Sequence, residues 1–147
     1  MDAQLLPPLV LMLVEDNAAD ERFFQEILKD VPISTTLKVA RNGEEALALL
    51  QTLSDDTDSL IPDVVFLDVH LPKKDGYEVL AELHTDARLS HLPVWVFVTT
   101  ENDLSKEVLA RQGLVVAGYL RKPVGVETLT QLLRHHVERR KTLLPQV

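Results

Sequence analysis

The sequence of 147 residues contains no cysteine. A disulfide framework and a metal site built from thiolates are therefore excluded. The absence agrees with a reducing compartment, and we expect a cytoplasmic protein. The length fits a single domain with one hydrophobic core, which we place at about residues 8–140, with a tail at 141–147.

Long apolar runs are also missing. The longest, Leu9–Val14, has six residues, whereas a membrane-spanning helix needs about 20. The first nine residues have no basic start and no small-residue cleavage pattern, so we expect no signal peptide. We therefore predict a protein that is not embedded in a membrane.

Basic residues are in the minority, with 15 Lys and Arg against 23 Asp and Glu and a formal net charge of −8. Proteins that bind nucleic acids usually carry a basic patch. The one basic cluster, at residues 134–141, also contains Glu138 and is typical of the polar face of a helix. We therefore expect no direct binding of nucleic acid. An acidic surface suits a protein whose own site attracts a divalent cation.

Five short apolar runs predict the strands of a sheet. They are Leu9–Val14, Thr36–Ala40, Val64–Leu67, Val94–Val98 and Val115–Leu120. The first, third and fourth are apolar at nearly every position, which is typical of parallel strands that are covered by helices on both faces.

Helical spacing of apolar residues predicts a helix after each run, and Asn17 is a typical N-cap for the first. The apolar positions are Phe23, Phe24, Ile27 and Leu28; Ala46, Leu47, Leu49 and Leu50; Val79, Leu80 and Leu83; Leu104, Val108 and Leu109; and Leu129, Leu132, Leu133 and Val137. The alternation predicts an α/β fold with a doubly wound sheet of five parallel strands. The polar, acidic stretch Ser54–Asp63 is expected to be an exposed loop.

Polar side chains follow four of the five runs. Glu15 and Asp16 follow the first run, Asp68 the third, Thr99 and Thr100 the fourth, and Arg121 and Lys122 the fifth. Ligands of open parallel sheets bind at the carboxyl ends of the strands. Any one of these residues could simply end a strand, but complementary groups on four strands favour a common site.

The chemistry of these groups points to transfer of a phosphoryl group. Carboxylates gathered at one end of a sheet repel one another and favour a shared cation. Oxygen ligands of this kind suit Mg²⁺. Ionised Asp68 can then attack phosphorus and form an aspartyl phosphate. Lys122 neutralises charge on the transferring group, and Thr99 can donate a hydrogen bond to it.

Four motifs resemble those of the response-regulator receiver family, and the likeness covers nearly the whole chain. They are LVEDN at Leu13–Asn17, FLDVHLPKKDGYEVL at Phe66–Leu80, VTTE at Val98–Glu101 and GYLRKPV at Gly118–Val124. The resemblance implies a flavodoxin-like (βα)5 fold with strand order 2-1-3-4-5. It also implies phosphotransfer from a sensor histidine kinase to a phosphoacceptor that is not an enzyme, beyond catalysing its own phosphorylation and dephosphorylation.

The resemblance assigns a role to each matching residue. Glu15 and Asp16 match the acidic pair that binds Mg²⁺ (or Mn²⁺), and His70 matches the position whose backbone carbonyl completes the metal site. The remaining roles fall on Asp68 as phosphoacceptor, Lys122 as the lysine that pairs with the phosphoryl group, Thr99 as switch hydroxyl and Tyr119 as switch aromatic. Counting back from Lys122 indicates Thr100 instead of Thr99. The bond between Lys122 and Pro123 is expected to be cis.

Further features are similar to small stand-alone receivers that pair with phytochrome-type kinases. These are the start EDNAADERFFQEIL, the loop Ser54–Asp63 and the turn LPKKDG. The likeness implies a homodimer through the face of the fourth helix, fifth strand and fifth helix, which phosphorylation would switch. With no output domain expected after the last helix, the protein would act on another protein or dimerise. The apolar tail Leu143, Leu144, Pro145 and Val147 would add to the contact, with disorder as the alternative.

Two alternatives stay open. A phosphatase of the haloacid dehalogenase type needs a second Asp two residues after the nucleophile, where this sequence has His70. A pseudo-receiver would use the fold without phosphorylation, but such modules usually lose the acids or the lysine.

The sequence indicates no functional role for the remaining histidines or for the tryptophan. His84, His91, His135 and His136 have no catalytic partner at a recognisable spacing. His135 and His136 fall in the last helix and are expected at the surface, with a helix–helix contact as the alternative. Trp95 lies within an apolar run and is expected in the core.

Overall fold

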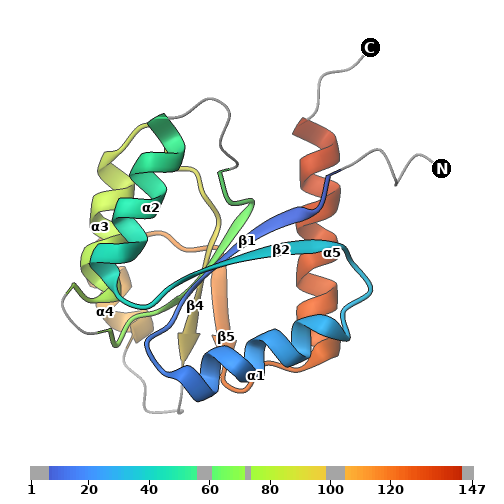
Figure 1. Cartoon of the computed structure of the whole chain (residues 1–147). Coiled ribbons are helices and arrows are strands. Elements are labelled where there is room, and N and C mark those ends of the chain that lie inside the picture. Colours follow the sequence, from blue (N-terminus) through green and yellow to red (C-terminus); the bar gives the residue numbers. More distant parts are fainter. Residues whose placement is uncertain (1–6, 56–60, 72–73, 99–104, 144–147) are drawn as a thin grey trace.

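The computed structural model describes residues 7–55, 61–71, 74–98 and 105–143. Its strands form one sheet with helices packed on both faces (Figure 1). The strands are β1 (Leu9–Val14), β2 (Thr35–Ala40), β3 (Val64–Asp68), β4 (Val94–Val98) and β5 (Gly118–Arg121). The helices are α1 (Ala18–Lys29), α2 (Gly43–Asp55), α3 (Gly76–Thr85), α4 (Ser105–Arg111) and α5 (Val126–Leu143).

The sheet has the order β2-β1-β3-β4-β5, and every neighbouring pair of strands is parallel. This confirms the predicted flavodoxin-like fold. Val14 at the end of β1 lies opposite Leu67 near the end of β3. The residues that follow these two strands therefore emerge side by side at the carboxyl edge of the sheet.

Apolar side chains form one hydrophobic layer on each face of the sheet. Helices α2, α3 and α4 cover one face, and α1 and α5 cover the other. In the second layer the ring of Phe24 lies 5.1 Å from that of Phe66 and 6.3 Å from that of Phe97, measured between centroids. Strands β1 and β3 are buried at every position, as the sequence predicted, whereas in β4 the residues Trp95 and Val98 are only half-buried. In the described part of the chain, no helix has the length and apolar character needed to span a bilayer.

Side-chain caps determine where two helices begin. Asn17 is the N-cap of α1, as predicted, and its Oδ1 accepts a hydrogen bond of 2.9 Å from the backbone N–H of Asp20. Helix α3 starts with a complete capping box, in which Asp75 and Glu78 each accept a hydrogen bond from the backbone N–H of the other. Such caps satisfy backbone donors that have no partner within the helix. Both caps lie at the carboxyl edge of the sheet, since α1 follows β1 and α3 follows β3.

The predicted start of the fifth strand was wrong. Strand β5 begins at Gly118, three residues after the predicted Val115, which is 74% exposed. The chain leaves α4 through Gly113, whose φ of 70° suits glycine. The backbone N–H of Val115 then donates to His84 Nε2 of α3 at 3.0 Å, so this apolar segment is a loop tied to a helix. The predicted helix residue Leu104 lies outside the described residues.

The expected surface position of His136 was also wrong. His136 is 5% exposed, and its Nε2 accepts a hydrogen bond of 3.0 Å from Trp95 Nε1. The reason is its place on α5, one turn after the buried Leu132 and Leu133. Trp95, which was expected in the core, is only half-buried and packs against the edge of the layer that includes α5.

Burial of His136 should make the protein less stable in mild acid. Burial and the nearby His135 and Arg139 lower the pKa of His136 from 6.5 to about 4. The unfolded chain therefore binds a proton that the folded chain resists. The stabilisation is complete above about pH 6.5 and is lost as the pH falls toward 4. We expect a loss of about 2 kcal/mol in unfolding free energy between pH 7 and pH 5.

Urea unfolding, followed by the fluorescence of Trp95, measures this effect. His136→Gln keeps an acceptor for the indole N–H and should reduce the pH dependence by about that amount. His135→Gln, one residue away and exposed, should retain most of it. Equal pH profiles for the wild type and His136→Gln would show that His136 is not the responsible group.

Candidate functional site

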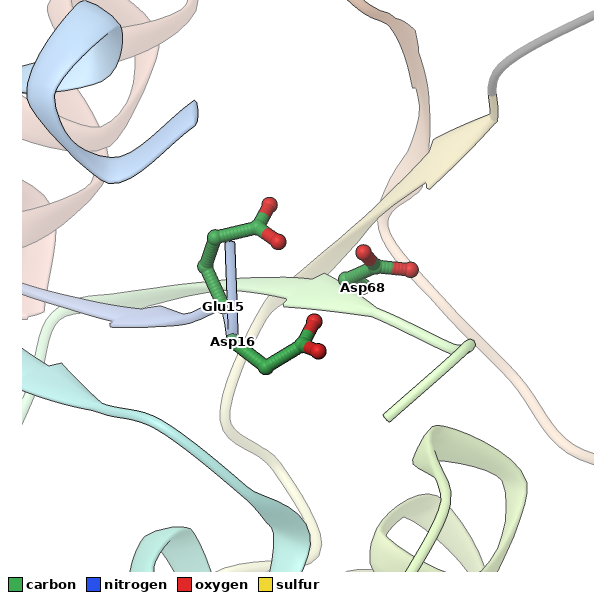
Figure 2. Close-up of side chains that lie close together, drawn as sticks. All are labelled: Glu15, Asp16 and Asp68. Atoms are coloured by element: carbon green, nitrogen blue, oxygen red, sulfur yellow. The ribbon is translucent and has the colours of Figure 1, made fainter. Parts of the chain in front are cut away.

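Three carboxylates meet at the carboxyl edge of the sheet. Glu15 and Asp16 follow β1, and Asp68 is the last residue of β3. Figure 2 shows the three side chains gathered at the ends of these strands, with the carboxylates of Glu15 and Asp16 pointing toward the side of Asp68. Each residue offers an oxygen within 4.8 Å of the oxygens of the other two. Glu15 and Asp68 are buried and Asp16 is exposed, so the group opens to solvent on one side.

Lys122, which follows β5, reaches into the same group of acids. Its Nζ lies 2.6 Å from Glu15 Oε1, 3.0 Å from Asp20 Oδ2 and 3.2 Å from Asp68 Oδ2. The ring of Phe97 lies beneath the ammonium, with its centroid 5.5 Å from Nζ. The peptide bond between Lys122 and Pro123 is cis, as predicted. The structure thus brings together the predicted residues Glu15, Asp16, Asp68 and Lys122.

The electrostatics of the site follow from its burial and its excess of acids. Burial raises the pKa of Glu15, and the charge of Asp68 acts in the same direction, against the lowering effect of Lys122. Burial alone would lower the pKa of Lys122, but its hydrogen bonds to Glu15 and Asp20 and the charge of Asp68 outweigh burial and raise that pKa. Lys122 is therefore a permanent positive charge beside carboxylates that are costly to keep ionised together.

The backbone around Asp68 holds one of its oxygens. The N–H of His70 donates to Asp68 Oδ1 at 2.9 Å. The residue after Asp68, Val69, packs tightly against Gly76. A Cβ placed on Gly76 would lie 2.5 Å from Val69 Cα, closer than real contacts allow. Only glycine lets the start of α3 pack this closely against the end of β3. The His70 side chain is exposed, which agrees with a role for its backbone rather than its imidazole.

Of the two predicted switch residues, the structure describes only Tyr119. Thr99 and the alternative Thr100 lie outside the described residues, so the switch hydroxyl stays a prediction. Tyr119 is half-buried on β5, packs against the layer under α2, α3 and α4, and has Lys106 Nζ of α4 5.1 Å from its ring centroid. Burial, with the charge of Glu107, raises the pKa of Tyr119, so its hydroxyl stays neutral at physiological pH.

Sequence reasoning missed the place of Asp20 in this site. Its signal was the N-cap: with Asn17 ending the loop after β1, Asp20 must lie on the first turn of α1, beside the strand end. Its contact with Lys122 joins residues 102 apart in the chain. No local pattern carries that pairing.

A groove of about 510 Å³ opens beside Lys122. Its lining residues are Leu13, Glu15, Ala19, Asp20, Phe23, Phe24, Phe97, Lys122, Pro123 and Val124. Phe23 belongs to the apolar positions that predicted α1, yet its side chain is 45% exposed at this groove. The groove therefore combines apolar walls with the charged groups of the site.

The chain belongs to the response regulator receiver domain family, whose model matches residues 11–134. It is 40% identical over 128 residues to the response regulator Rcp1 of Synechocystis sp., a match that covers 87% of this chain and 86% of Rcp1. The structure resembles that of the phosphorylated cyanobacterial phytochrome response regulator RcpA, with a TM-score of 0.69, 35% identity, and coverage of 88% of this chain and 91% of RcpA.

It also resembles the Mn²⁺-bound form of Rcp1, with a TM-score of 0.67, 35% identity, and coverage of 96% of this chain and 99% of that chain. The predicted resemblance to receivers is thereby confirmed. Family membership and the strand order together decide against the phosphatase alternative.

Proposed function

We propose that the protein is the phosphoacceptor of a two-component system, taking a phosphoryl group from a sensor histidine kinase onto Asp68. The observation that carries this proposal is the meeting of Asp68 with two further carboxylates and the ammonium of Lys122 at one edge of the sheet. A nucleophilic oxygen and a fixed positive charge are the groups that phosphoryl transfer needs.

The donor set fits a bound Mg²⁺ or Mn²⁺. Carboxylate oxygens within 4.8 Å of one another, from Glu15, Asp16 and Asp68, are the hard ligands that these ions prefer. The backbone carbonyl of His70 would complete the set. One ammonium faces this many acids, so a divalent cation would relieve their repulsion. When bound, it supplies positive charge to the phosphoryl oxygens.

The residues of the chain divide the reaction between them. The N–H of His70 holds Asp68 Oδ1, and Oδ2 accepts from Lys122 on the other side; we assign Oδ2 as the attacking oxygen. A bond forms between Oδ2 and phosphorus as the bond from phosphorus to the phosphohistidine nitrogen breaks, and that nitrogen keeps the electron pair. Lys122 then donates to a phosphoryl oxygen.

The proposal extends to the partner and the readout. Because similar proteins include a cyanobacterial phytochrome response regulator, we assign a phytochrome-type kinase as partner, in the cytoplasm. We assign residues 1–147 to one receiver domain. Helix α5 reaches into the predicted tail as far as Leu143. Phosphorylation would change the face formed by α4, β5 and α5, where Lys106 contacts Tyr119. This face would then form a homodimer or bind a partner protein. We propose no contact with nucleic acid or with a membrane.

Labelling by acetyl phosphate with and without Mg²⁺ tests this function. A phosphoacceptor takes the label only with Mg²⁺. A pseudo-receiver stays unlabelled under both conditions.

Phe23 should matter for transfer from the kinase. Its exposed ring on the groove wall is available to a protein partner that brings its phosphohistidine to Asp68. We expect Phe23→Ala to slow phosphotransfer from the kinase by about tenfold, the effect of losing one aromatic anchor. Labelling by acetyl phosphate, which is too small to need this wall, supplies the reference rate.

Ile61→Ala is the matched control, since Ile61 is 39% exposed and precedes β3 at the opposite edge of the sheet. It should leave transfer from the kinase within about twofold of the wild-type rate. Equal slowing by both substitutions would show that the groove is not the surface that recognises the kinase.

A further inference from the structure

The carboxylate of Asp20 faces both Lys122 and the solvent. Its Oδ2 lies 3.0 Å from Lys122 Nζ, and its side chain is 46% exposed. The other two acids that contact Lys122, Glu15 and Asp68, have side chains only 2% and 10% exposed. Asp20 also lines the groove beside the site. It is therefore the acid of this lysine cluster that an incoming molecule meets first.

Asp20 is not used to cap its own helix. It stands three residues after the N-cap of α1, where Glu78 stands in α3. Glu78 reaches back to the backbone N–H of its N-cap residue at 3.2 Å. In α1 the corresponding N–H, of Asn17, donates instead to Glu15 Oε2 at 3.2 Å. The carboxylate of Asp20 is thus left for Lys122.

This placement has a consequence for small phosphodonors. Before transfer, such a donor is an anion that must approach Lys122 through the solvent-facing side of the site. There it meets the negative charge of Asp20, which also takes up one of the hydrogen bonds that Lys122 could give. A protein donor can offset this cost with contacts to the apolar wall, whereas a small donor has no such contacts.

We propose that Asp20 is a positioning and specificity residue, which retains the Lys122 ammonium in the resting site and disfavours small anionic phosphodonors. The proposal rests on the function of Asp68 as phosphoacceptor. Because the Coulomb energy is proportional to the charge of the donor, a dianion must be disfavoured more than a monoanion.

The test compares the concentration dependence of labelling for two donors at pH 7 and saturating Mg²⁺. Acetyl phosphate is a dianion and phosphoramidate a monoanion under these conditions. Asp20→Asn should lower the half-saturating concentration of acetyl phosphate about fourfold and that of phosphoramidate about twofold. In about 1 M salt, where charges are screened beyond about 3 Å, both gains should vanish.

Glu26→Gln is the matched control, because Glu26 lies on the same helix, is 61% exposed and pairs with Lys29. This substitution should leave the half-saturating concentrations of both donors unchanged. Equal gains for the two donors, or no gain for either, in Asp20→Asn would overturn the proposal. Absence of label in the wild type would instead contradict the proposed function, so the two failures are distinguishable. Urea unfolding of Asp20→Asn in EDTA verifies that the variant folds.

Discussion

Asp68→Asn is expected to reduce phosphoryl labelling by acetyl phosphate at least about 100-fold, to background. An amide oxygen is a poor nucleophile and cannot form a stable acyl phosphate. The substitution keeps the shape of the side chain and an oxygen that can accept the hydrogen bond from the N–H of His70. It also removes a negative charge that acts on the buried Glu15. We therefore expect a folded protein, and loss of label will report chemistry rather than unfolding.

Asp30→Asn is the matched control for this variant. Asp30 is exposed at the C-terminal end of α1, away from the carboxyl edge of the sheet. The same change of group there should leave labelling at the wild-type level. Full labelling of Asp68→Asn, measured by the mass shift of the intact protein, would show that another residue accepts the phosphoryl group.

Lys122→Met is expected to destabilise the metal-free protein by about 3 kcal/mol. Methionine retains most of the side-chain volume but leaves Glu15, 2% exposed, and Asp68, 10% exposed, without their shared counter-ion. Uncompensated carboxylates in a buried place must either repel one another or take up protons. Urea unfolding in EDTA measures the loss of free energy.

Addition of Mg²⁺ should restore a large part of that loss, because a cation bound only by the folded state stabilises it. The increase in stability with Mg²⁺ should therefore be larger for Lys122→Met than for the wild type. Lys29→Met removes a lysine that is 69% exposed and should cost less than about 1 kcal/mol under either condition. A Lys122→Met variant as stable as the wild type in EDTA would mean that the ammonium does not balance these acids.

The buried strands could be predicted from the sequence because burial on both faces leaves an unambiguous pattern. The run Leu9–Val14 matches β1 to the residue, and the run Val64–Leu67 matches β3 except for its last residue, Asp68. The start of β5 could not be predicted, because an apolar run does not reveal whether its residues are covered. Val115 is 74% exposed and its N–H is bound to His84 of α3, a contact that depends on tertiary structure.

The site was predictable to the extent that it depends on topology. Parallel strands bring their carboxyl ends to one edge, so Glu15, Asp16 and Asp68 had to meet. The contact of Asp20 with Lys122 joins residues 102 apart and has no local signature. His136 shows the opposite case: its position one turn after Leu132 marked it for burial, but its polarity favoured the surface. The indole N–H of Trp95 provides the partner that makes this burial tolerable.

The residue that carries the phosphoryl group is the strictest test of Asp68 as the phosphoacceptor. Wild-type protein would be labelled with acetyl phosphate in Mg²⁺ or in EDTA and reduced with borohydride, which converts an aspartyl phosphate to homoserine. Tandem mass spectrometry then locates the product. We predict homoserine at position 68 in the Mg²⁺ sample and none in EDTA. Homoserine at position 16 or 20 with Asp68 intact, or equal labelling in EDTA, would contradict a metal-assisted nucleophile at the end of β3.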